Sequence, residues 1–213
     1  MAVAIRELEK ETAEAAKQSA QQSAATTLGR ESATGPSVVE DVLNAEKGAP
    51  KPIDPRRAGF FADERVPVYE YPDPKNLIGQ ELPDTCVGAC GRMRLADLGE
   101  DVTEPTARQW LGVPEKGGIA IEKIAPPLKT KFGIDVEPSK VSFEQLAQSK
   151  SPSIVAIRGH AVVVDGVKKG LVSIRDPLPV GQGSSYRVLS EDFKRFFEAA
   201  EESGRALIFG KGK

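Results

Sequence analysis

The chain has one histidine and two cysteines, Cys86 and Cys90, in 213 residues. Two cysteines this close cannot join distant parts of a chain, and one histidine leaves too few soft ligands for a structural zinc site. These shortages exclude a disulfide scaffold and a zinc module, and we expect no cofactor. The 29 basic and 31 acidic residues nearly balance, so nothing in the charge predicts a nucleic-acid partner.

Long apolar runs are also lacking. Charged residues begin at Arg6, which leaves no apolar core for a signal peptide, and no stretch of about 18 apolar residues follows. We therefore expect a protein without a membrane span, made in the cytoplasm without a classical signal peptide. A specialised secretion system is the expected route of any export.

The first 59 residues lack aromatic side chains, since the first aromatic residue is Phe60. Eight of the sixteen prolines lie between Pro36 and Pro83, where they push the preceding residues out of helical conformations. Residues 4–28 are rich in helix formers but carry only a thin apolar stripe. We therefore expect an N-terminal helix and a flexible, proline-rich segment over residues 1–73, with a disordered tail of no function as the alternative. The folded domain is expected over residues 74–213.

Within that domain the sequence pattern changes from helical to extended. Helices are expected over 86–98, capped by Asp84 or Thr85, over 103–110, opened by Thr103, and within 119–131 with a break at the paired prolines. Two more are expected over 142–147, where Ser142 and Gln145 form a capping box, and over 190–200, capped by Ser190. Strands are expected at 135–137, 153–158, 161–164, 171–174, 186–188 and 206–209. Helices followed by an antiparallel sheet predict an α+β fold.

Cys86 is the candidate nucleophile. Its position at the expected start of a helix exposes the sulfur to unpaired N–H groups and to the positive end of the helix dipole, and both favour the thiolate. Free cysteines are more often buried packing residues, and Cys90, one turn further on, is interpreted in that way.

The candidate partners of the thiol are His160, the sole histidine, and Asp176. If residues 168–170 form a three-residue hairpin loop, residue numbers that face each other sum to 338, so Asp176 faces Val162. His160 and Asp176 then become diagonal neighbours at the end of an apolar face, and a shift of one residue would separate them. The alternatives are an ordinary surface or core histidine and a turn aspartate before Pro177.

Gln80 lies six positions before Cys86, where its amide could help to bind an oxyanion. The stretch from Gln80 to Leu98, with the runs around Gly159–His160 and Asp176–Pro177, resembles papain-like cysteine peptidases, most closely the bacterial double-glycine leader peptidase type. The resemblance implies a papain-like fold, in which the helix that carries the nucleophile packs on an antiparallel sheet. It also implies Cys86 as nucleophile, His160 as general base and acid, Asp176 as its orienting partner and Gln80 in the oxyanion hole.

The resulting functional prediction is a thiol peptidase that cleaves a protein or peptide backbone. Stand-alone domains of this type occur in toxins and effectors, so a secreted bacterial effector or toxin is the expected role, with an immunity or inhibitor protein as a further partner. Two alternatives stay open: a glutamine deamidase or acyltransferase with the same triad, and a degenerate binding module. The family commonly has aspartate directly before the cysteine, whereas Thr85 stands there in this chain.

Overall fold

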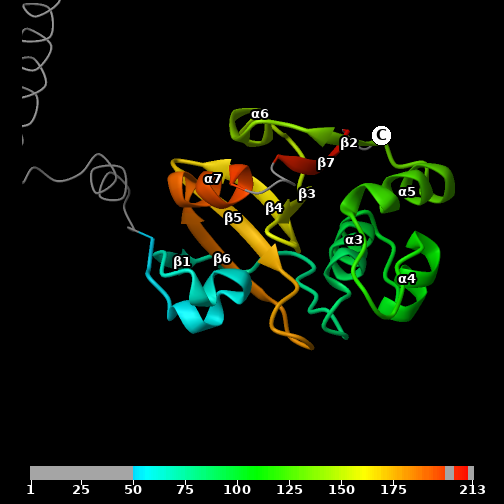
Figure 1. Cartoon of the computed structure of the whole chain (residues 1–213), viewed down its shortest axis with the longest axis horizontal. Helices are drawn as coiled ribbons and strands as arrows, with labels where there is room; N and C mark the ends of the chain where they lie inside the picture. Colours follow the sequence, from blue (N-terminus) through cyan, green and yellow to red (C-terminus); the bar gives the residue numbers. More distant parts are fainter. Residues whose placement is uncertain (1–49, 200–203, 211–213) are drawn as a thin grey trace, which may run out of the picture. The chain divides into compact units, whose positions relative to one another are not determined.

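The computed structural model describes residues 50–199 and 204–210, so the expected helix at residues 4–28 lies outside the described residues. A group of helices forms one side of the molecule (Figure 1). It comprises α3 (Cys86–Asp97), α4 (Glu104–Leu111), the 3-10 helix η3 (Ile121–Ile124) and α5 (Ala125–Phe132). No helix in the described part of the chain has the length and apolar character needed to cross a membrane.

The helix ends follow local chemistry. Thr103 caps α4, because its side chain accepts a hydrogen bond from the Thr106 N–H, and Gly112 ends the helix in the left-handed conformation. The paired prolines lie in the first turn of α5, where a missing N–H costs nothing, so they begin that helix after η3. The α6 helix (Phe143–Ala147) has the predicted capping box of Ser142 and Gln145.

Within the described residues, seven strands form a single antiparallel sheet in the order β1-β6-β5-β4-β3-β7-β2. Their bounds are β1 Val68–Glu70, β2 Val136–Lys140, β3 Ser153–Ile157, β4 His160–Lys168, β5 Leu171–Asp176, β6 Ser184–Leu189 and β7 Arg205–Phe209. The helix α7 (Ser190–Glu198) follows β6 directly. Ser190 is the first residue of that helix and Leu189 occupies the cap position, so the predicted serine cap is wrong. The helices and the antiparallel sheet confirm the α+β class.

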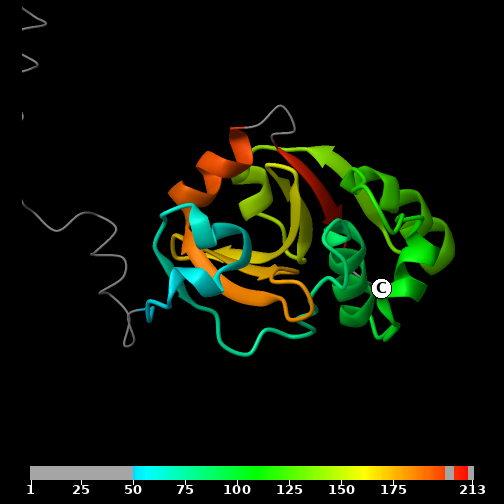
Figure 2. The ribbon, with the colours of Figure 1, turned by 60° about the horizontal axis from the view of Figure 1, so that its bottom comes forward.

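The sheet is covered on both faces, as Figure 2 shows. Alternate residues of β4 enter different cores: Val162 and Val164 pack in the cluster that includes α7, whereas Ala161 and Val163 pack in the cluster that includes α3. The sequence predicts an apolar surface on one face of this hairpin only. The second face is covered because the helical layer lies over it.

The hairpin of β4 and β5 reaches the predicted register by an unexpected route. Its turn has two residues, Lys169 and Gly170, both with positive φ, instead of the expected three. Near the turn the paired residue numbers sum to 339, as for Val167 and Val172. The register then shifts between Val164 and Gly166, and Val164 pairs with Ile174, which restores the sum of 338. This irregularity compensates for the shorter turn before the strands reach His160 and Asp176.

The structure differs from the expected domain boundary at residue 73. β1 pairs with β6, and Phe61 and Val68 are buried in the core beside α7. Two 3-10 helices, η1 (Pro55–Arg57) and η2 (Gly59–Asp63), lead into β1. Prolines in this segment do not prevent packing, because 3-10 turns and short edge strands tolerate them. The folded domain therefore includes the segment from about residue 51 onward.

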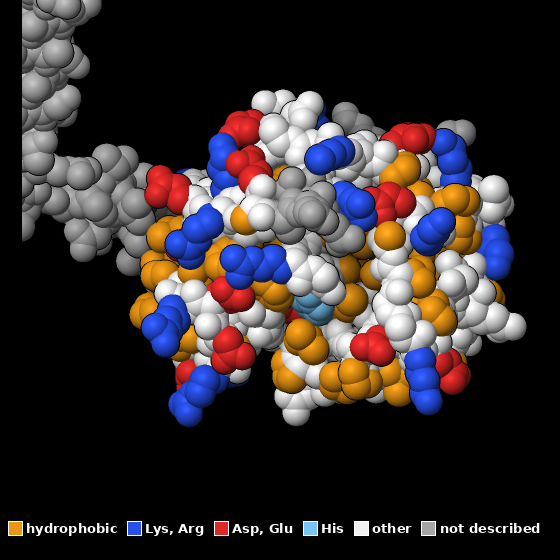
Figure 3. Space-filling view, viewed as in Figure 1, with side chains coloured by type: hydrophobic (Ala, Val, Ile, Leu, Met, Phe, Trp, Pro, Cys, Tyr) orange, Lys and Arg blue, Asp and Glu red, His pale blue; other side chains and the backbone are white. Residues whose placement is uncertain are grey.

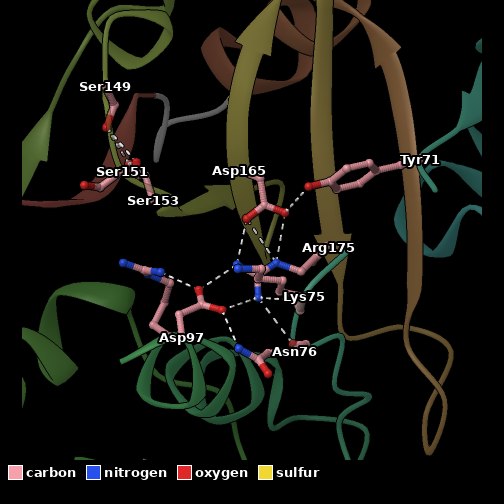
Figure 4. Close-up of polar contacts among 10 residues, drawn as sticks. Tyr71, Lys75, Asn76, Asp97, Ser149, Ser151, Ser153, Asp165 and Arg175 are labelled. Atoms are coloured by element: carbon pink, nitrogen blue, oxygen red, sulfur yellow. Dashed lines mark hydrogen bonds and ion pairs between the residues drawn. The ribbon is translucent and has the colours of Figure 1, made fainter. Parts of the chain in front are cut away.

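A buried ion network fastens α3 to the sheet. Figure 4 shows Arg175 of β5 between Asp97 of α3 and Asp165 of β4, with Tyr71 on the far side of Asp165. The guanidinium donates to Asp97 at 2.8 Å and to Asp165 at 2.7 Å, and the Tyr71 hydroxyl donates to Asp165 at 3.0 Å. Since Asp165 lies where the β4–β5 register shifts, the network also holds the irregularity in place.

Candidate active site

The candidate nucleophile lies at the start of a buried helix. Cys86 is the first residue of α3 and is 9% exposed. The first N–H groups of a helix have no acceptor within the helix, so they and the helix dipole face the thiol region. Cys90 is fully buried, and its thiol donates to the Ala161 carbonyl at 3.3 Å. Burial raises the pKa of the Cys90 thiol, which makes Cys90 a packing residue.

Thr85, where the family commonly has aspartate, holds the loop before α3. Its side chain makes no cap to the helix and instead bonds the Leu82 carbonyl at 3.0 Å and Glu104 at 2.5 Å. Glu104 of α4 is fully buried and also accepts from the Glu81 N–H at 2.7 Å. The loop that presents Cys86 is thus fixed to α4. Of the two expected caps, Asp84 or Thr85, Thr85 occupies the cap position, but its hydroxyl is engaged in these contacts and makes no cap hydrogen bond.

The candidate base follows a tight turn. Arg158 and Gly159 both have positive φ and join β3 to β4, so His160 is the first residue of β4 and pairs with Ile157. Its Nε2 lies 2.8 Å from Oδ1 of Asp176, the last residue of β5. That contact leaves Nδ1 as the ring nitrogen available to Cys86, and the thiol and the imidazole line the same pocket.

The environment keeps His160 protonated. Burial alone would lower its pKa, but hydrogen bonds and charge interactions with Asp176 and Cys86 outweigh burial and raise the pKa to about 9. An imidazolium that persists at neutral pH beside a thiol stabilises the thiolate. The arrangement can therefore provide a nucleophile and a proton donor together.

Asp176 is fully buried and accepts four hydrogen bonds. Oδ1 accepts from His160 and from the Leu178 N–H at 2.9 Å, and Oδ2 accepts from the Phe60 N–H at 2.8 Å and the Tyr186 hydroxyl at 2.6 Å. Burial and the carboxylate charge raise the pKa of Tyr186 well above its ordinary value, so this hydroxyl keeps its proton and donates. The carboxylate is thereby fixed in orientation toward the imidazole.

The supporting residues that the sequence does not predict are Phe60, Leu178, Tyr186 and Glu104. Phe60 and Leu178 contact Asp176 through backbone N–H groups, which every residue except proline has, so their side chains give no signal for that contact. The adjacent Phe60 and Phe61, the first aromatic residues in the chain, were a usable sign of a buried anchor. Glu104 stands one residue after a predicted helix cap, where an acidic residue is commonplace.

Gln80 is buried beside the same loop, but its amide N–H groups bond loop carbonyls and are not available as donors to the cleft. Its Nε2 donates to the Leu82 carbonyl at 2.8 Å and the Pro83 carbonyl at 2.6 Å, which uses both N–H groups. Its Oε1 is buried without a partner in the described part of the chain. The structure brings Cys86, His160 and Asp176 together and places Gln80 next to them in a different orientation from the one expected.

A pocket of about 240 Å³ opens in front of Cys86 and His160. Small side chains line much of it, from Gly118, Ala120, Ala156, Gly159 and Ala161, and Glu122 and Arg205 lie at its edge. In Figure 3 the histidine, coloured pale blue, is visible in a recess between hydrophobic side chains. A larger cavity, of about 1130 Å³, surrounds Arg94 and Asp97 and does not include the thiol.

Comparison with known proteins agrees with this geometry. Residues 75–200 match the model of the Peptidase C39 family. The chain belongs to the Peptidase C39 family. It is a papain-like cysteine peptidase, which confirms the resemblance and the predicted class of enzyme. The family's region begins at residue 75 and so leaves the segment with η1, η2 and β1 outside it.

Solved structures with the C39 fold are similar to this peptidase at low identity. The peptidase domain of Streptococcus ComA, a bifunctional ABC transporter of a quorum-sensing pathway, is 20% identical over 65% of this chain and 100% of its own, with a TM-score of 0.53. A C39-like peptidase from Bacillus anthracis is 17% identical over 65% and 96%, also with 0.53. A double glycine motif protease from an AMS/PCAT transporter, solved with a leader peptide, is 24% identical over 68% and 91%, with 0.48. No curated protein matches the chain.

Proposed function

We propose that this C39 peptidase cleaves a peptide bond with Cys86 as nucleophile, His160 as general acid and base, and Asp176 as the group that orients the imidazole. The observation that carries the proposal is the arrangement of the three side chains: Cys86 and His160 line one pocket, and His160 is bonded through Nε2 to a buried carboxylate. A nucleophile next to a base that a third group orients is the signature of covalent catalysis.

The reaction balances with these groups. The Cys86 thiolate attacks the carbonyl carbon, and the developing oxyanion accepts hydrogen bonds at the start of α3, where the Cys86 N–H lies. The C–N bond then breaks as His160 gives its proton to the leaving amine, which leaves a thioester on Cys86. Water attacks the thioester as it loses a proton to His160, the C–S bond breaks, and the acid product departs from the regenerated Cys86 thiolate and His160 imidazolium.

Gln80 is proposed as the second oxyanion donor, after its amide turns from the loop carbonyls toward the substrate. Its unpartnered, buried Oε1 supports this proposal, since the amide is only half satisfied in its present orientation. Gln80→Ala is expected to lower kcat by about 10²-fold with little change in KM. An unchanged kcat would remove Gln80 from the mechanism.

The proposed substrate is a peptide with small side chains next to the scissile bond. Support comes from the pocket, whose small lining residues leave about 240 Å³ in front of the thiol. Its edge carries one acidic and one basic side chain, Glu122 and Arg205, 3.5 Å apart, so no net charge selects the substrate there. The role of a secreted bacterial effector or toxin, the export route and the immunity or inhibitor protein stay predictions from the sequence.

Incubation of the chain with a defined peptide mixture tests the proposal, with mass spectrometry of the products. We expect cleavage at Gly- or Ala-rich sites, complete loss of it in Cys86→Ala and His160→Ala, and a smaller loss in Asp176→Asn. Peptides of unchanged length in which a glutamine amide has become an acid would indicate a deamidase instead. Cleavage that persists in Cys86→Ala would refute the assignment of the nucleophile.

A further inference from the structure

The segment that precedes the family's region covers the His160–Asp176 pair. It is coloured cyan in Figures 1 and 2 and contains η1, η2 and β1. The matched C39 region starts only at residue 75. The contacts of this segment with the site are therefore an addition to that region and are not used by the chemistry described above.

Phe60 touches both members of the pair. Its backbone N–H donates to Asp176 Oδ2 at 2.8 Å. Its ring is parallel to the imidazole of His160, with an interplanar angle of 3° and ring centroids 5.9 Å apart. That distance lies in the range of offset aromatic stacking, which fixes the tilt of both rings. One residue thus contacts the carboxylate with its main chain and the base with its side chain.

The chain is fitted closely to the carboxylate at the preceding residue. Gly59 has a φ of +52°, and a Cβ atom there would lie 2.5 Å from Asp176 Oδ2 and 2.8 Å from Ser184 Oγ. Only glycine accepts both the left-handed conformation and this approach. The Phe60 N–H reaches Asp176 because the backbone passes directly over it.

Independent contacts anchor the segment on either side of Phe60. Phe61 is fully buried, with edge-to-face contacts to Phe196 at 5.1 Å and to Tyr186 at 5.9 Å. Glu64 forms an ion pair of 3.2 Å with Arg158, in the turn just before His160. The segment is therefore held at its core and at the catalytic turn, which gives Phe60 a fixed platform.

We propose that Phe60 is a positioning residue, which holds the imidazole of His160 in line with Asp176 and shields their hydrogen bond from water. A hydrogen bond of this kind is stronger where water is excluded, and the side chain of His160 is only 11% exposed. Phe60 acts through His160 and does not itself touch the reacting atoms. The inference rests on the proposed catalytic roles of Cys86 and His160.

Two readouts in the full-length chain test this role. The first is the rate of Cys86 alkylation by iodoacetamide between pH 5 and 9, which needs no substrate and in which the buried Cys90 takes no part. The second is solvent exchange of the Nε2 proton by NMR, which is unambiguous because the chain has one histidine. Phe60→Ala removes the ring, Phe60→Leu keeps apolar volume for folding, and Phe60→Tyr keeps the ring.

We expect Phe60→Ala and Phe60→Leu to slow alkylation at pH 6 by about 10- to 100-fold and to speed Nε2 proton exchange, while Phe60→Tyr stays near the wild type. The matched control is Phe132→Ala, which removes another half-buried aromatic ring, packed on Trp110 in the helical layer. It should leave both readouts unchanged.

The possible outcomes separate this inference from the proposed function. If the wild type reacts rapidly at pH 6 but Phe60→Leu reacts equally fast with a protected Nε2 proton, Phe60 has no positioning role. Equal losses in Phe132→Ala would also overturn the inference, because they would show general loosening. If the wild type reacts at pH 6 like an ordinary thiol, whose pKa is about 8.5, and His160→Ala changes nothing, the proposed catalytic pair itself fails.

Discussion

The packing of residues 51–70 can be tested by one substitution, Phe61→Ala. Phe61 is fully buried, and its ring contacts Phe196 and Tyr186 edge to face. Removal of a buried phenylalanine side chain costs about 3–5 kcal/mol, since transfer energy is lost and a cavity remains. For a domain of this size each kcal/mol lowers Tm by about 2–4 °C, so we expect a decrease of roughly 6–20 °C.

The assay is thermal unfolding followed by circular dichroism, with Leu98→Ala as the control. Leu98 is 46% exposed, so its truncation should change stability by less than about 0.5 kcal/mol. A Tm of Phe61→Ala equal to that of the control would refute the packing described for this segment. It would instead support the flexible tether over residues 1–73 that the sequence predicted.

Three further predictions concern the buried polar groups. Tyr186→Phe removes one of the four hydrogen bonds to Asp176 and should lower the free energy of unfolding by about 1–3 kcal/mol in urea denaturation. Arg175→Met leaves two carboxylates without their buried partner and should cost about 3–5 kcal/mol in the same assay. Because the pKa of His160 is raised to about 9 in the folded chain, its charged form stabilises the fold fully below pH 6.5, and this contribution should disappear as pH rises through about 9. His160→Gln should lack that part of the pH dependence in denaturation measured at successive pH values.

The class of fold followed from the sequence because helix caps and strand alternation are local signals. Thr103 and the capping box of Ser142 and Gln145 begin helices as predicted, since a cap acts within one turn of its own residue. Thr85 shows the limit of this reasoning. Its hydroxyl bonds Glu104, nineteen positions away, and no local pattern can predict that a tertiary partner will take a side chain from its expected cap.

The meeting of His160 and Asp176 was predicted from a register whose basis was partly wrong. The expected three-residue turn is a two-residue turn, and the irregularity beside Asp165 restores the pairing. A shift of one residue would move Val162 and Val164 from one core to the other and would separate His160 from the face that it shares with Asp176. The irregularity beside Asp165 is therefore what lets the shorter turn and the catalytic register occur together.

The support of the candidate site was largely hidden from the sequence because main-chain atoms provide much of it. Two of the four donors to Asp176 are N–H groups, at Phe60 and Leu178, and two carbonyls determine where the Gln80 amide points. Residue type indicates which groups can do chemistry, whereas the backbone path decides how they are oriented. Gly59 is the one residue in the sequence whose type reflects this backbone path. Because glycine has no Cβ, the chain can pass directly over the Asp176 carboxylate.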